Sequence, residues 1–320
     1  MAAAPGAGGG PLSTRVRVLP ALAAALDAGN PVVALESSVL AQGLPIPSNR
    51  DAAERMTRAV ERGGAIAGIT GVVRGVPTLG LEPDELLRFL ARDGVRKVSS
   101  RDLGIAMAQH ADGATTVAGS LCIAGAVNAH IFATGGIGGV HRDAPFDESA
   151  DLVELARTPM IVVCAGAKSI LDLPATLERL ETLGVAVIGY RTDEFPGFFT
   201  RTTGLRLTAR ADSPDEIAAM HLASRSLGRR QATLVVQPPP EDSALPQDLV
   251  DSAVADALAD AGRAGVRGAA ATPFLLDAVL RATEGRSLLA NLGLLEENAL
   301  LAAQIAVALA RPCGTARQSG

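Results

Sequence analysis

The most informative part of the sequence is residues 132–172, FATGGIGGVHRDAPFDESADLVELARTPMIVVCAGAKSILD. Its pattern predicts a strand, a glycine-rich loop, an acidic loop, a helix and a second strand. The second strand, IVVC at 161–164, is a short apolar run, as expected of a strand buried on both faces of a parallel sheet. Lys168 follows it after three small residues. Because ligands bind at the carboxyl ends of strands in open α/β sheets, we expect Lys168 to lie in a functional site.

Lysine is scarce in this chain. Lys97 and Lys168 are its two lysines, and the other 27 of its 29 basic residues are arginines. Arginine stays protonated in proteins, whereas a desolvated lysine amine can lose its proton and act as a nucleophile. The presence of a lysine in such an arginine-rich chain therefore indicates a role that arginine cannot fill, above all at Lys168. The alternative, a chance lysine on a solvated face, stays open for both residues.

Composition limits the classes of function. The net charge of −5 and the aromatic content of 2%, with no Trp, argue against a nucleic-acid-binding surface, which would be basic or would carry stacking platforms. No stretch of about 18 residues is apolar enough to predict a membrane span. The three cysteines (Cys122, Cys164, Cys313) show neither metal spacing nor a disulfide framework, so a reducing, cytoplasmic setting is expected.

The rest of the chain alternates between strand and helix patterns, which predicts a single α/β domain. We expect this domain at 15–311, with tails at 1–14 and 312–320. Predicted strands lie at 32–35, 65–73, 76–81, 161–164, 186–189 and 233–236. Predicted helices lie at 19–28, 49–61, 82–91, 113–126, 173–183, 213–227, 247–262, 273–283 and 287–310. The segment 190–203 concentrates aromatic residues and could form a lid, a subunit contact or a packed loop.

Other polar residues stand near predicted strand ends or helix starts. Glu36 follows the apolar run 32–35, as Lys168 follows 161–164, and its alternative role is that of a paired structural carboxylate. Lys97 opens the segment KVSSRDL. The amides that begin the predicted helix 113–126 could hold a phosphate, although an ordinary Thr N-cap explains the same pattern.

The glycine-rich loop is not a dinucleotide-binding fingerprint, because its four glycines do not fit G-x-G-x-x-G. His141 follows it, and Asp147, Ser149 and Asp151 would share one face if extended. Carboxylates with waters suit Mg²⁺ or Mn²⁺, but Asp147 or Ser149 could simply cap a helix. In the last predicted helix, Asn291 and Asn298 lie seven residues apart on one face. Both would need partners if buried, so they are weak site candidates.

Taken together, these segments resemble the pseudouridine-5′-phosphate glycosidase, or indigoidine synthase A-like, family. The matching stretches are ALESS, KVSSRDL, GATTVA, FATGGIGGVHR, FDESADL, VVCAGAKSILDL, IGYRT, PGFF, ATPFLL and NALLAAQIA, and they span about residues 30–310. The resemblance implies a three-layer α/β/α fold with a mostly parallel central sheet, and a homotrimer. It also implies Mn²⁺-assisted, reversible cleavage of a small-molecule substrate, pseudouridine 5′-phosphate, to uracil and ribose 5-phosphate.

The resemblance also implies roles for individual residues. Lys168 would be the nucleophile, Glu36 the proton donor and Asp147 the metal ligand. The residues expected around the substrate are Lys97, Val117, Thr134, His141, Ser149, Ala150, Asp151 and Asn298. Two alternatives stay open: another Schiff-base lyase or aldolase that acts on a sugar phosphate, and a non-catalytic nucleotide-binding protein.

Overall fold

The computed structural model describes residues 16–142, 146–266 and 271–311. The predicted tails at 1–14 and 312–320 lie outside these residues. A large hydrophobic core joins the central strands to the helices that cover them. It is built mainly from alanine, valine, leucine and isoleucine, as expected for a chain whose sequence has few aromatic residues.

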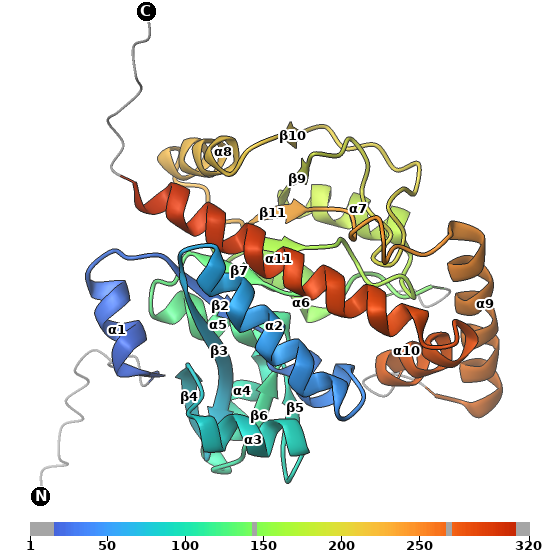
Figure 1. The fold of residues 1–320 in the computed structure, drawn as a ribbon, viewed down its shortest axis with the longest axis horizontal. Helices are drawn as coiled ribbons and strands as arrows, with labels where there is room; N and C mark the ends of the chain where they lie inside the picture. Colours follow the sequence, from blue (N-terminus) through green and yellow to red (C-terminus); the bar gives the residue numbers. More distant parts are fainter. Residues whose placement is uncertain (1–15, 143–145, 267–270, 312–320) are drawn as a thin grey trace, which may run out of the picture.

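The centre of the sheet is parallel (Figure 1), in the order β3-β2-β7-β8-β11-β9. Its strands are short apolar runs with buried centres, as the sequence predicts. Their bounds are β2 (Val32–Leu35), β3 (Ile66–Val73), β7 (Ile131–Ala133), β8 (Ile161–Cys164), β9 (Ala186–Tyr190) and β11 (Thr233–Val236).

Shorter strands extend the sheet at its edges. Beyond the core strands, β4 (Val76–Leu79) and β6 (Gly113–Thr115) both run antiparallel to β3. The remaining edge pairs are parallel: β1 (Arg17–Val18) with β4, β5 (Arg96–Val98) with β6, and β10 (Arg210–Ala211) with β9. The sheet is therefore mixed at one edge and parallel where the predicted site lies.

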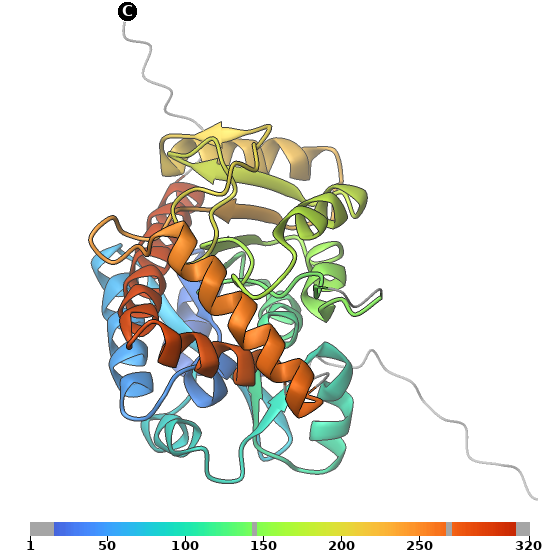
Figure 2. The ribbon, with the colours of Figure 1, turned by 90° about the vertical axis from the view of Figure 1, so that its right-hand side faces the viewer.

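Helices cover both faces of the sheet (Figures 1 and 2). One layer holds α2 (Ser48–Arg62), α8 (Pro214–Ser226) and α11 (Arg286–Ala310). The opposite layer holds α5 (Val117–Ala126), α6 (Ala150–Leu155) and α7 (Leu173–Thr182). This arrangement confirms the predicted three-layer α/β/α fold with a mostly parallel sheet.

The other helices lie around these layers. They are α1 (Pro20–Asp27), α3 (Pro83–Ala91), α4 (Leu103–Ala108), and the short turns η1 (Val39–Gly43) and η2 (Ser100–Asp102). Helices α9 (Gln247–Ala264) and α10 (Ala271–Ala282) pack against each other and lie beyond the carboxyl ends of the central strands (Figure 2). They therefore stand where a ligand of an α/β sheet is expected.

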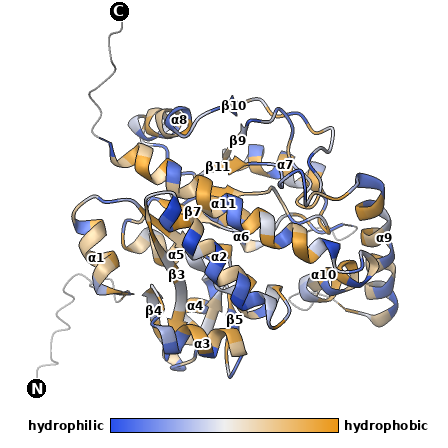
Figure 3. Ribbon diagram, viewed as in Figure 1, coloured by the Kyte–Doolittle hydropathy of each residue, from blue (hydrophilic) through white to orange (hydrophobic). Residues whose placement is uncertain are grey.

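Helix α11 corrects one expectation from the sequence. By length and composition it could cross a membrane, because an 18-residue window has a mean hydropathy of 1.4. However, 56% of that window is buried inside the protein, and the helix packs against α2, α8 and β7. The hydrophobic bands along α11 in Figure 3 alternate with polar ones. These contacts are those of a core helix.

The predicted helix 113–126 begins too early. Residues 113–115 form β6, which pairs with β3 and β5, and α5 starts only at Val117. Thr116 caps the helix, because its hydroxyl accepts a hydrogen bond from the Gly119 amide. The sheet partners decide the conformation of these residues, and a local pattern does not reveal such partners.

Candidate active site

The candidate site forms where three neighbouring parallel strands end. In the register of the sheet, Leu35 of β2 lies beside Ala133 of β7, and Ala133 lies beside Val163 of β8. The residues that follow Leu35 and Ala133 are Glu36 and Thr134. Strand pairing alone therefore brings these two polar side chains together, although they are 98 residues apart in the sequence.

Glu36 is held by two hydroxyl groups. The Thr134 Oγ1 donates to Glu36 Oε2 at 2.5 Å, and the Ser38 hydroxyl donates to Oε1. All three residues are buried, with 4% of Glu36 exposed. Because both carboxyl oxygens are engaged, the side chain has a fixed orientation at the strand end.

Lys168 is placed by backbone pairing between the end of β8 and the glycine-rich loop. The amide of Ala165 donates to the Gly135 carbonyl at 2.8 Å, and the amide of Lys168 donates to the Ile137 carbonyl at 3.1 Å. These bonds continue the parallel pairing of β7 with β8 beyond the strands. The lysine is therefore attached to a rigid segment and not to a free loop.

The segment 190–203 folds against this connection. Residues 195–200 are buried, and the amide of Phe198 donates to the Ala165 carbonyl at 3.2 Å. A Cβ on Gly136 would lie 2.6 Å from the Phe198 ring, and one on Gly166, where φ is +87°, would lie 2.4 Å from the Pro196 carbonyl oxygen. Both positions therefore require glycine. In the single chain, this segment takes the packed-loop alternative.

One pocket collects four of the predicted residues. Glu36, Lys97, Thr134 and Lys168 all line it, and its empty space is about 520 Å³, part of it open to solvent. Residues of η1 and of helices α10 and α11 form the side that faces these polar groups. The pocket therefore lies between the strand ends and the C-terminal helices.

Lys97 belongs to the same electrostatic environment. Desolvation lowers the pKa of Lys97 below its usual value, and the positive charge of Lys168 lowers it further. The carboxylates of Glu36 and Asp151 act in the opposite direction. Two amines thus share one pocket with a buried carboxyl group, which is an arrangement more typical of a reaction site than of a structural ion pair.

Cys164 is no competing nucleophile. Burial raises the pKa of the Cys164 thiol to about 12, although hydrogen bonds from the Gly166 and Ile137 amides and the charge of Lys168 oppose the change. The thiolate is the reactive form of cysteine. The amine of Lys168, which lines the pocket, is therefore the better candidate nucleophile at this strand end.

A network of buried hydroxyl groups lies behind the pocket. Thr70 Oγ1 lies 2.9 Å from Thr115 Oγ1 and 2.8 Å from Ser120 Oγ, and the Thr115 amide donates to Ser37 Oγ at 2.8 Å. Ser37 follows Glu36, and Thr115 belongs to β6, which pairs with the strand of Lys97. The network therefore fixes the Glu36 strand end relative to β5.

Asp151 joins two helix starts to the glycine-rich loop. Its two carboxylate oxygens accept hydrogen bonds from the Ala118 amide at 2.9 Å and the Gly138 amide at 2.8 Å. The Ser149 hydroxyl accepts from the Asp151 amide at 3.2 Å, so Ser149 caps α6, as the alternative interpretation expected. Val117, at the first turn of α5, is 1% exposed. None of these residues lines the pocket, and neither does Ala150.

His141 and Asp147 form a separate pair, and neither residue lines the pocket. His141 Nδ1 lies 2.9 Å from Asp147 Oδ2, and 46% of the Asp147 side chain is exposed. Within the described ranges, no group of three or more His, Cys, Asp or Glu side chains could hold a metal ion. A hard ion such as Mg²⁺ usually keeps several waters and takes one or two carboxylates. The exposed Asp147 carboxylate fits such a water-rich site and does not fit an all-protein cage.

Asn298 lies beneath the site. Its amide nitrogen donates to the Thr134 carbonyl at 2.8 Å, and its oxygen accepts from Gln237 at 2.9 Å. The side chain is 1% exposed and lies outside the residues that line the pocket. In this structure Asn298 supports the backbone that carries Thr134, and direct contact with a substrate stays a prediction.

Sequence reasoning did not select several pocket residues. Ser38, which holds Glu36, gave a signal in its position directly after a predicted strand end. Asn291, by contrast, is one of the two asparagines that the sequence already indicates as weak site candidates, and it lines the pocket. No local pattern indicates the residues that enter from distant parts of the chain, which are Gln42, Phe198, Pro273 and Leu276.

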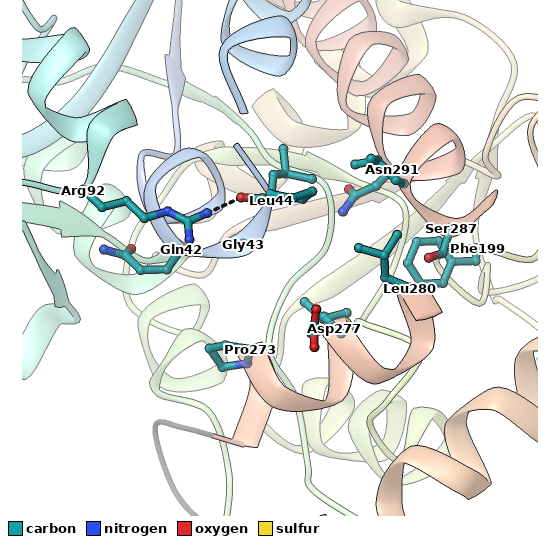
Figure 4. Close-up of a pocket in the computed structure, with 13 residues that line it drawn as sticks. Gln42, Gly43, Leu44, Arg92, Phe199, Pro273, Asp277, Leu280, Ser287 and Asn291 are labelled. Atoms are coloured by element: carbon teal, nitrogen blue, oxygen red, sulfur yellow. Dashed lines mark hydrogen bonds between the residues drawn. The ribbon is translucent and has the colours of Figure 1, made fainter. Parts of the chain in front are cut away.

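A larger hollow adjoins the pocket (Figure 4). It has about 830 Å³ of empty space, much of it open to solvent, and it shares Gln42, Pro273, Leu276 and Asn291 with the inner pocket. Arg92 closes one side, where its guanidinium donates to the Leu44 carbonyl. The two cavities therefore adjoin at these shared residues, and both are partly open to solvent.

Comparisons with known proteins agree on one family. The family model described as "Indigoidine synthase A like protein" matches residues 21–308. The chain is 67% identical over 285 residues to the pseudouridine-5′-phosphate glycosidase of Gemmatimonas aurantiaca, which covers 89% of this chain and 93% of that protein.

Two solved structures share the fold. One is the prealnumycin C-glycosynthase AlnA in complex with ribulose 5-phosphate, with a TM-score of 0.86, 37% identity and coverage of 92% of this chain and 97% of that one. The other is an indigoidine synthase A-like protein from Thermotoga maritima, with a TM-score of 0.86, 32% identity and coverage of 96% and 100%.

Proposed function

Because the chain belongs to the indigoidine synthase A-like family, we propose that it catalyses the reversible cleavage of pseudouridine 5′-phosphate to uracil and D-ribose 5-phosphate. One observation carries the proposal: a lysine and a buried carboxyl group, Lys168 and Glu36, line one pocket at the ends of strands that flank β7. The named relatives, at up to 67% identity, support the same reaction.

The bond to be broken explains why a lysine is needed. In pseudouridine the ribose C1′ is joined to C5 of uracil, so the leaving atom is carbon and has no lone pair to protonate. An amine attached to C1′ can supply electrons and form an imine as the C–C bond breaks. A carboxylic acid nearby can then deliver the proton that the departing carbon needs.

The proposed reaction has three steps. The Lys168 nitrogen bonds to C1′, and the ring oxygen leaves C1′ as the ribose opens and takes the proton that the nitrogen loses. Glu36 then protonates C5 of uracil while the C1′–C5 bond breaks and the nitrogen lone pair forms a protonated imine with C1′. Water hydrolyses this imine, which releases ribose 5-phosphate, regenerates the amine and returns a proton to Glu36. Proton transfer of this kind requires a fixed carboxyl group, and the two hydroxyls on Glu36 supply that constraint.

Lys97 and the start of α5 are proposed to bind the phosphate. Helix N-termini attract anions, and Lys97 lies on β5, which is parallel to the strand that leads into α5. Asp151 already occupies the Ala118 amide, so Lys97 supplies the free positive charge on this side. A bound phosphate dianion would oppose the desolvation and the Lys168 charge that lower the pKa of Lys97, and would favour its protonated form.

We further propose Mn²⁺ as the cofactor, a homotrimer as the assembly and the cytoplasm as the location. Asp147 would hold the ion, with waters completing its shell, and a bound divalent cation supplies positive charge near an anionic substrate. Fully exposed Phe146 and largely exposed Leu227 are apolar surfaces that a subunit contact could cover. Free Cys122 and Cys164 are consistent with a reducing compartment.

The test is a direct assay. Protein, Mn²⁺ and pseudouridine 5′-phosphate are incubated, and uracil is followed by chromatography. Borohydride in the presence of ribose 5-phosphate should add a pentose phosphate to Lys168, detectable by mass spectrometry. Release of a small carbonyl fragment without uracil would indicate an aldolase. Binding without trapping or turnover would indicate a non-catalytic protein, and either result would refute the proposal.

A further inference from the structure

Asn291 carries a buried amide that the proposed chemistry does not yet use. The residue is 7% exposed, and its Oδ1 has no hydrogen-bond partner among the described residues. A buried polar atom without a partner costs free energy, so native structures rarely keep one without a reason. Figure 4 shows the amide pointing from α11 into the hollow beside the pocket.

The position of Asn291 relates it to the catalytic carboxyl group. Asn291 lines both the inner pocket and the outer hollow. Its Oδ1 would lie 3.4 Å from a Cβ on Gly135, the residue after Thr134, and Thr134 donates to Glu36. A ring whose reacting carbon faces Glu36 can therefore extend its edge toward Asn291.

The two ends of a substrate must occupy different sides of the pocket. Lys97, the residue proposed to bind phosphate, lies on β5 at the edge of the sheet, beyond β6, whereas Asn291 lies on α11, which packs on the central strands β2, β7 and β8. A sugar phosphate bound by Lys97 and Lys168 leaves the α11 side for the part of the substrate that departs.

We propose that Asn291 recognises the uracil ring through a lactam edge, that is, through one ring N–H and the adjacent carbonyl oxygen. An asparagine amide offers one acceptor and one donor with matching spacing. Uracil joined through C5 keeps both of its ring N–H groups, whereas in an N-glycoside one ring nitrogen is bonded to the sugar. Asn291 would then determine which base the enzyme accepts. This inference rests on the proposed function.

The experiment uses the synthetic direction, because it separates the base from the sugar. The KM for uracil is measured at saturating ribose 5-phosphate in the wild type, Asn291→Ala and the control Ser287→Ala. Ser287 is one helical turn earlier on α11, and it lines the outer hollow but not the inner pocket. Borohydride trapping of ribose 5-phosphate reports imine formation at Lys168, a step that does not involve uracil.

We expect Asn291→Ala to raise the KM for uracil about tenfold, the usual effect of one lost hydrogen-bond pair. Its borohydride trapping and the KM of Ser287→Ala should match the wild type. As a measurement that needs no variant, the wild type should discriminate about tenfold against 1-methyluracil or 3-methyluracil. Asn291→Ala, which has room for the methyl group, should lose that discrimination.

Three results would overturn the inference. One is an unchanged KM for uracil in a folded Asn291→Ala protein, and another is an equal loss of trapping, which would place Asn291 on the sugar side. The third is a wild type that accepts both methylated bases like uracil. If the wild type neither traps ribose 5-phosphate nor makes pseudouridine 5′-phosphate, the proposed function itself has failed, and this inference falls with it.

Discussion

Replacement of Thr134 by valine should impair the acid step and leave imine formation intact. Valine keeps the shape of threonine and removes the hydroxyl that donates to Glu36 Oε2 at 2.5 Å. A hydrogen bond to a charged group contributes about 1.5–3 kcal/mol, which corresponds to roughly 10- to 150-fold in rate if the bond acts wholly in the transition state. Because the Ser38 hydroxyl still holds the other oxygen, we expect a loss near the lower limit, about tenfold in kcat.

The assay compares two steps in the same protein. Uracil release from pseudouridine 5′-phosphate reports C–C cleavage, and borohydride trapping with ribose 5-phosphate reports imine formation at Lys168. Thr158→Val is a matched control, because the Thr158 hydroxyl donates to Oε1 of the buried Glu154 at 2.9 Å, and neither residue lines the pocket. The control should lose a similar amount of thermal stability and keep its activity.

Two outcomes would refute this reasoning. If Thr134→Val releases uracil at the wild-type rate while it is folded, the hydroxyl does not position Glu36 for catalysis. If trapping and uracil release fall by the same factor, Thr134 acts on Lys168 or on sugar binding. A comparable loss of activity in Thr158→Val would show that general destabilisation, and not the bond to Glu36, causes the effect.

Three further predictions concern the charged residues. Lys168→Arg should abolish turnover and trapping with little change in melting temperature, because charge survives and nucleophilicity does not; turnover in the folded variant would remove Lys168 from the mechanism. The pKa of Lys97 is lowered, so the charge of Lys97, and with it the affinity for phosphate, should fall as the pH rises through a value below the pKa of free lysine. In Lys97→Arg the KM for ribose 5-phosphate should not change with pH over the same range. If the wild type and Lys97→Arg show the same dependence of this KM on pH, the proposed role of Lys97 is contradicted. Asp147→Ala should raise the Mn²⁺ concentration for half-maximal activity and weaken Mn²⁺ binding seen by electron paramagnetic resonance; an unchanged titration would leave Asp147 as a partner of His141 only.

The sequence predicts both members of the proposed catalytic pair, Glu36 and Lys168, for a physical reason. Short apolar runs followed by Glu36 and Lys168 indicate buried parallel strands, and such strands carry their ligands at the carboxyl ends. What the sequence does not contain is the order of the strands. Only the structure shows that β7 lies between β2 and β8, and this order is what turns Thr134 into the hydrogen-bond partner of Glu36.

The two asparagines of α11 show a second limit. Both face the core side of one helix, and their spacing predicts a shared environment. In the structure, Asn298 is satisfied by Gln237 and by the carbonyls of Thr134 and Gly135, whereas the Asn291 oxygen has no partner among the residues that the structure describes. The difference arises because Gln237 follows the end of β11, so only the sheet beneath the helix decides which asparagine is satisfied.

The pocket has two sides that are built in different ways, and this difference has a functional consequence. The strand-end side is fixed by backbone pairing, as for Lys168, and by buried hydroxyls, as for Glu36. The opposite side consists of side chains from α10 and α11, such as Leu276 and Asn291, which in the described part of the chain share no hydrogen bond with Glu36 or Lys168. A substitution on the helical side can therefore change which base is accepted without displacing the amine or the acid. Changes in base specificity should consequently arise in α10 and α11, and changes in reaction chemistry at the strand ends.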